Sequence, residues 1–80
     1  MSPEQEGVMR HATGLLVSKT SFRNRFVTGP KTDEFETCRE CVEDGLMVDS
    51  GPKELFGGMH CFSVTPAGYV ALGHPEGETP

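Results

Sequence analysis

The last third of the chain constrains the fold most, because it reads as a helix end, two strands and a new helix start. Asp44-Gly45 is a typical helix stop. Leu46 to Val48 is a short apolar stretch that predicts a strand, and Asp49-Ser50-Gly51-Pro52 predicts the turn that ends it. Gly57-Gly58 then precedes Met59 to Val64, a stretch whose alternation predicts a returning strand. A helix followed directly by a hairpin is therefore expected.

The returning strand is expected to have one face in the core. His60, Phe62 and Val64 lie two residues apart and so share a face. The apolar side chains of Phe62 and Val64 indicate that this face packs inward. Thr65-Pro66 then predicts the start of a last helix, which Gly73 ends.

This succession resembles the C-terminal half of a winged helix. The resemblance implies an α+β fold with about three helices, a two- or three-stranded β-hairpin wing and a short C-terminal helix. We expect one domain over residues 1–73 and a flexible tail over residues 74–80, which contain two prolines and two glutamates.

The N-terminal residues predict the first helix. Ser2 is a typical N-cap, Pro3 suits the first helical position, and Gln5 stands where a capping box places its reciprocal acceptor. We expect the helix to end near Gly14. Its apolar stripe is expected to contain Val8, Ala12 and either Leu15 or Leu16.

A second helix is expected after Asp33 or Thr32, either of which can cap it, with Gly45 ending it. Its buried stripe is predicted to contain Phe35, Cys38, Val42 and also Cys41. The segment between the two helices is ambiguous, because Phe22 and Phe26 share a face in both a helix and a strand. Either a short helical turn or an extended element fits there.

Length and composition exclude several classes of protein. A chain of 80 residues cannot enclose a large active site. The three histidines are scattered, and neither a nucleophile motif nor a phosphate-binding glycine loop is present. We therefore expect no enzyme and no cofactor. No apolar run is long enough for a membrane span, and three cysteines fit a reducing compartment, so a cytoplasmic protein without a membrane partner is expected.

The charges are divided along the chain. Residues 7–32 contain no acidic residue and five basic ones, whereas residues 33–80 contain ten acidic residues and two basic ones. The basic residues of the first segment are Arg10, Lys19, Arg23, Arg25 and Lys31. They could bind an anionic partner, or they could neutralise the acidic half within the chain or across a dimer contact.

A metal site is the weakest of the candidates. Cys38 and Cys41 are separated by two residues, and His60-Cys61 follows downstream, which is a combination that zinc sites use. Neighbouring residues of a strand point to opposite faces, however, and Cys38 falls on the apolar stripe of its helix. Packing of Cys38 and Cys41 in the core is the preferred interpretation, with a zinc-stabilised module as an alternative that would include His60.

DNA binding is the usual function of a winged helix, which inserts the helix before the hairpin into the major groove. Here that helix is acidic, so its carboxylates would repel phosphates. We therefore favour a protein partner, possible sites being Asp33, Glu34, Glu36, Glu40 and Glu43. The alternative is a DNA-binding transcriptional or accessory protein that uses Arg10, Lys19, Arg23, Asn24, Arg25 and Lys31.

Several segments also resemble a family of small uncharacterised phage and prophage proteins. These are Arg10 to Leu15, Phe22 to Pro30, Asp44 to Met47 and Thr65 to Gly68. The resemblance covers most of residues 10–72 and implies a location in the host cytoplasm if the protein is phage-encoded. It implies no activity, and it leaves the partner and the oligomeric state open. The partner of such a module could be a host or phage nucleic-acid machine.

Overall fold

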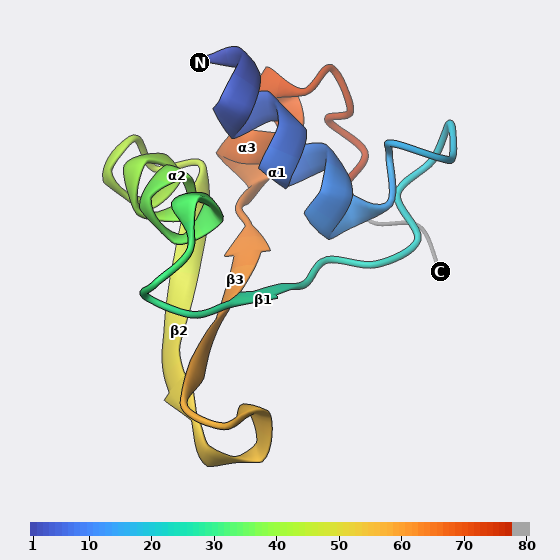
Figure 1. The fold of residues 1–80 in the computed structure, drawn as a ribbon. Helices are drawn as coiled ribbons and strands as arrows, with labels where there is room; N and C mark the ends of the chain where they lie inside the picture. The colour runs from blue at the N-terminus through green and yellow to red at the C-terminus, as the bar shows by residue number, and fades with distance from the viewer. Residues whose placement is uncertain (78–80) are drawn as a thin grey trace.

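The computed structural model describes residues 1–77, except for the side chain of Phe56. The helices are α1 (Pro3–Thr13), α2 (Asp33–Glu43) and α3 (Pro66–Ala71), as Figure 1 shows. The strands are β1 (Phe26–Thr28), β2 (Met47–Lys53) and β3 (Met59–Val64), with a short 3-10 turn at Glu54–Phe56. The predicted α+β class is thus confirmed, with three helices and one three-stranded sheet in the described residues.

The sheet is antiparallel and has the order β1-β3-β2, so β3 is the central strand. Phe26 of β1 and Asp49 of β2 both face Phe62 in the register, and Met47 of β2 faces Val64. The β2–β3 hairpin extends away from the three helices (Figure 1). One half of the hairpin therefore supports the core and the other half projects from it.

The hairpin differs from the expected one at β2. The sequence predicted that the strand ends at Val48 and turns at Asp49-Ser50-Gly51-Pro52, but β2 continues to Lys53. The register shifts between Asp49 and Pro52, where Gly51 has a φ of 82°. A bulge takes up extra residues without ending the pairing of the strands. The glycine and proline therefore mark a bulge, and the hairpin reverses later, after Lys53.

The helix boundaries follow the capping residues. Ser2 and Gln5 form the predicted capping box, and Gly14 ends α1 in the left-handed conformation with a φ of 85°. Of the two residues proposed to cap α2, Thr32 is the one whose side chain accepts the Phe35 N–H. Thr65 caps α3, as predicted. These caps satisfy backbone N–H groups that helix ends leave without partners.

The segment between α1 and β1 contains no helix: residues 14–20 form turns and bends, Ser21 makes an isolated bridge, and residues 22–25 lead into β1. The Phe22 N–H donates to the Thr13 carbonyl and the Arg25 N–H to the Ala12 carbonyl, at 3.2 and 2.9 Å. The Asn24 side chain donates to the Val64 carbonyl at 2.9 Å and accepts from the Val64 N–H at 2.6 Å. Contacts with distant residues therefore hold this segment along the end of β3.

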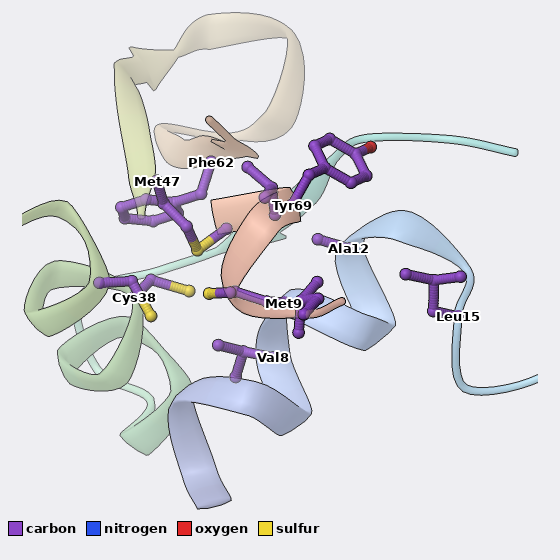
Figure 2. Close-up of a cluster of buried hydrophobic side chains, with 11 residues drawn as sticks. Val8, Met9, Ala12, Leu15, Cys38, Met47, Phe62 and Tyr69 are labelled. Atoms are coloured by element: carbon purple, nitrogen blue, oxygen red, sulfur yellow. The ribbon is translucent and has the colours of Figure 1, made fainter. Parts of the chain in front are cut away.

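The core lies between the helices and the inner face of the sheet, where Met9, Cys38, Met47 and Phe62 converge (Figure 2). The expected burial of Phe62 and Val64 is confirmed, and so is that of Val8, Ala12, Leu15, Cys38 and Cys41. Leu16, the alternative to Leu15, is 58% exposed. Phe35 and Val42 pack against the core from its edge. Met9 and Met47, at 0% and 1% exposure, belong to the core although the sequence analysis had not placed them there.

Residues 74–77 of the predicted tail form a turn in which the His74 N–H donates to the Tyr69 carbonyl at 2.8 Å. Residues 78–80 of that tail lie outside the described residues. Among the described helices, none has the length and apolar character that crossing a membrane requires.

The contact between α3 and the hairpin predicts the effect of a small substitution. A Cβ atom on Gly68 would meet the Leu46 carbonyl oxygen and the Val64 side chain, whereas one on Gly7 in α1 would meet nothing within 4 Å. Gly68→Ala should lower the free energy of unfolding by about 1–3 kcal/mol, because the backbone of Leu46 must shift. Gly7→Ala should raise it by about 1 kcal/mol, because alanine favours a helix. Urea unfolding of both variants checks this, and equal stability of the two would contradict the packing.

Candidate binding surfaces

The acidic residues of α2 form an exposed ridge. Asp33, Glu36, Glu40 and Glu43 follow one another at spacings of three, four and three residues, so they lie along one side of the helix. All four are exposed, while Cys38 and Cys41 on the other side are buried. We call these four residues the acidic face. Glu34, the fifth predicted residue, is also exposed but borders a shallow groove with Val8 and His11.

The acidic face has no cation of its own. Within residues 1–77 the ion pairs are Arg10–Glu6, Arg39–Asp49, His60–Asp49 and His74–Glu76, and none involves the acidic face. The last turn of α2 contains no basic residue. Carboxylates near a helix C-terminus oppose the helix dipole, at a cost of about 0.3–1 kcal/mol each. The C-terminal part of the ridge is therefore unfavourable for the isolated helix.

Asp49, in contrast, is fully engaged. Its carboxylate accepts from the Gly51 N–H at 2.7 Å, lies 2.9 and 3.0 Å from His60 Nδ1, and accepts from Arg39 Nη1 at 3.1 Å. Burial raises the pKa of Asp49, but the bonds from Gly51, His60 and Arg39 outweigh it and leave the pKa below its usual value. This cluster joins α2, β2 and β3 at the bulge.

The proposed zinc ligands are not brought together. Cys38 and Cys41 are completely buried. Burial raises the pKa of Cys38 to about 12 and that of Cys41 to about 11, and neighbouring acidic groups add to both effects, as does Cys41 for Cys38. Burial thus favours the neutral thiols, and zinc binding would have to overcome this preference because its cysteine ligands are thiolates. His60 turns its Nδ1 to Asp49, and no group of three or more His, Cys, Asp or Glu residues in the described chain could hold a metal.

The predicted nucleic-acid-binding residues divide into two groups. Lys19, Arg23 and Arg25 are exposed on residues 14–25, the segment that we call the basic loop. It lies on the side of the molecule opposite α2 in Figure 1. The other three occupy different places. Arg10 pairs with Glu6, Asn24 is bound to Val64, and Lys31 lies in the turn before α2.

The basic loop also exposes apolar side chains, which the sequence analysis did not single out. Leu16, Val17 and Phe22 are 58%, 83% and 52% exposed. Arg23 Nη2 donates to the His11 carbonyl at 2.7 Å, and its guanidinium lies 5.4 Å from the centre of the Phe22 ring. The signal in the sequence was the mixture of apolar and basic residues between two glycine-containing turns. The loop thus exposes both apolar and cationic side chains, and Leu16 also lines the groove that Glu34 borders.

The chain matches no family model, and no significantly similar curated protein or solved structure was found. The two charged surfaces and the projecting hairpin are the features of the molecule that bear on its function.

The Asp49 cluster predicts a pH-dependent contribution to stability. Because the pKa of Asp49 is lowered in the folded state, the contribution is present above the ordinary aspartate pKa of about 3.9 and is lost as the pH falls through the folded value. Asp49→Asn should lower the free energy of unfolding at pH 7 by about 1–3 kcal/mol, as expected for lost hydrogen bonds to a charged group.

Urea unfolding between pH 7 and acidic pH measures this difference. The gap between parent and Asp49→Asn should narrow as the pH falls below about 4. Asp33→Asn, at an exposed position without an ion pair in the described chain, is the control and should cost no more than about 0.3–1 kcal/mol, the effect of a carboxylate in the first turn of a helix. A gap that stays constant with pH would show that the Asp49 charge is not the cause.

Proposed function

We propose that this protein is a non-enzymatic, winged-helix-like binding module whose acidic face docks on a basic surface of a protein partner. The observation that supports this most is the exposed ridge of Glu36, Glu40 and Glu43, which has no cation within the described chain. Proteins usually place cations, not acids, near a helix C-terminus. The C-terminal part of the ridge, which is unfavourable in the free protein, becomes favourable when a cationic partner covers it.

The winged-helix part of the proposal has its own support. Helix α2 leads into β2 through a short turn at Asp44 to Leu46, and the β2–β3 hairpin projects beside it like a wing (Figure 1). Strand β1 adds a third strand next to β3.

In a winged helix, the helix before the hairpin is the one that inserts into the groove of the bound DNA. Here that helix carries the acidic face, so the partner is expected to be cationic. A basic groove shaped for nucleic acid fits this description, and so a nucleic-acid machine of a phage or its host remains the proposed class.

The unfavourable charges give an estimate of the free energy that a cationic partner could offset on binding. Glu36 and Glu40 are one helical turn apart, and like charges at this spacing cost about 0.2–0.5 kcal/mol. Glu40 and Glu43 also oppose the helix dipole at about 0.3–1 kcal/mol each. Neutralising the ridge should therefore stabilise the free protein while it removes the binding surface. A purely structural helix would not combine these two effects.

We test this with the acidic-face variant Glu36→Gln/Glu40→Gln/Glu43→Gln. We expect a gain of less than about 1 kcal/mol in the free energy of unfolding, because the repulsion and the dipole costs at Glu40 and Glu43 are removed, while the favourable place of Glu36 in the first turn of α2 is lost. The matched control is Glu4→Gln/Glu54→Gln/Glu76→Gln, which changes the net charge equally at exposed positions outside α2. The control should gain no stability, because Glu4 lies in the first turn of α1, where a carboxylate is favourable.

Binding is then compared by immobilising the parent and both variants and applying a bacterial lysate. Proteins retained by the parent and by the control, released by salt and missing from the acidic-face variant would support the proposal. Retention of the same proteins by all three would overturn it. So would a loss of binding in the control variant of the same size, since that would reflect net charge alone.

The second candidate function is DNA binding by the basic loop. It is favoured by one observation: Lys19, Arg23 and Arg25 are exposed and have no carboxylate partner among the described residues. Cations of this kind contact phosphates and make affinity depend on salt.

Fluorescence anisotropy with labelled random duplex DNA, at about 50 and 200 mM salt, tests this candidate. If the basic loop binds DNA, Arg23→Ala/Arg25→Ala should abolish binding and lower the salt slope. Because Arg23 also bonds the His11 carbonyl, Arg25→Ala is compared with Lys53→Ala, which removes one positive charge from the hairpin. Absence of binding at the lower salt concentration, or an equal effect of the two single variants, would exclude the candidate.

A further inference from the structure

The chain carries two surfaces of opposite charge that do not pair with each other within the described residues. Helix α2, which carries the acidic face, and the basic loop lie on opposite sides of the fold (Figure 1), and no ion pair joins the acidic face to the basic loop within residues 1–77. Neutralisation inside one molecule, one of the alternatives left by the sequence, is therefore not achieved by direct pairing. The remaining way for the two surfaces to pair is contact between copies.

We propose that the protein associates head to tail with itself, the acidic face of α2 in one copy docking on the basic loop of the next. This rests on the proposed function, since it uses the same acidic face, and it names a second copy of the chain as a partner. The carboxylates of Glu36, Glu40 and Glu43 face three exposed cations, Lys19, Arg23 and Arg25, across this contact.

The composition of the basic loop fits a protein contact. Val17 is 83% exposed, Leu16 58% and Phe22 52%, and the three cations lie among them along the same short segment. An apolar centre within a polar rim is the usual anatomy of a protein interface. Phe22 is held in place, because its ring packs against Gly14 and under the Arg23 guanidinium. Arg25 is well suited to a carboxylate, since a guanidinium presents several N–H donors in a fixed plane.

The symmetry of the contact determines how the assembly grows. Because the two surfaces differ, the contact is heterologous, and a row of copies always keeps one open surface at each of its two ends. Growth therefore continues beyond the dimer unless a ring closes. Since the charges are exposed, the association should weaken as salt screens them, and the net charge of −5 limits its strength.

Analytical ultracentrifugation of the full chain over a range of concentrations tests the proposal. At low salt the weight-average mass should rise with concentration past that of a dimer, and at about 1 M salt, where screening acts within about 3 Å, it should stay that of a monomer. The acidic-face variant alone should remain monomeric. A basic-loop variant, Lys19→Gln/Arg25→Gln, should also remain monomeric; neither side chain makes a hydrogen bond or ion pair in the described residues, so its fold should persist.

The decisive step is to mix the two variants. Each retains the surface that the other lacks, so the mixture should form dimers and stop there. A monomeric parent at low salt, association of either variant alone, or a mixture that stays monomeric or grows past dimers would overturn the head-to-tail contact. The control Glu4→Gln/Glu54→Gln/Glu76→Gln should associate like the parent, and its failure to do so would also overturn the proposal.

These outcomes separate the two proposals. If the parent is monomeric but loses its lysate partners in the acidic-face variant, self-association fails and the proposed function stands. If the variant mixture forms dimers but no lysate protein depends on the acidic face, self-association stands and the foreign partner fails.

Discussion

The pairing of β3 with two neighbours is the interaction on which the rest of the structure depends. Phe62 at its centre is completely buried, and its ring meets that of Phe35 from α2 at 5.7 Å. At the end of β3, Val64 is bound by Asn24 and packs against Gly68. One strand therefore holds α2, the basic loop and α3 in place, which is why a chain of this size can orient two charged surfaces in opposite directions.

Local signals in the sequence predicted the elements whose structure is decided locally. The capping box at Ser2, the caps at Thr32 and Thr65, and the alternation in β3 all depend on residues within a few positions of one another. The path of the basic loop could not be predicted in this way, because its last residues are held by a hydrogen bond between Asn24 and Val64, forty positions away. At Gly51 the local signal fitted both a turn and a bulge, and cross-strand pairing selected the bulge.

The candidate surfaces show the same division. Their charges and the buried role of Cys38 could be read from the sequence, because helical spacing separates the two sides of α2. The separation of α2 from the basic loop could not be predicted from the sequence, because it depends on how the segment after α1 turns away from α2 (Figure 1). His60 was predicted to face the core, and its ring does contact Phe35. Its hydrogen bond to Asp49 was not expected, because the sequence analysis placed Asp49 in a turn and not in a strand paired with β3.

The carboxylates of this chain differ in whether a cation pairs with them within the described residues. Asp49, which fastens the bulge, receives Arg39, His60 and a backbone N–H. Arg39 lies on α2 itself, one residue before Glu40, yet its guanidinium reaches to β2. The fold can therefore bring cations to a carboxylate whose task is structural, and it brings none from the described chain to the acidic face. Because unpaired exposed charges keep their water and cost little, they can persist until a cationic surface arrives. This contrast is the physical support for the proposal that the acidic face binds a partner, whereas Asp49 stabilises the fold.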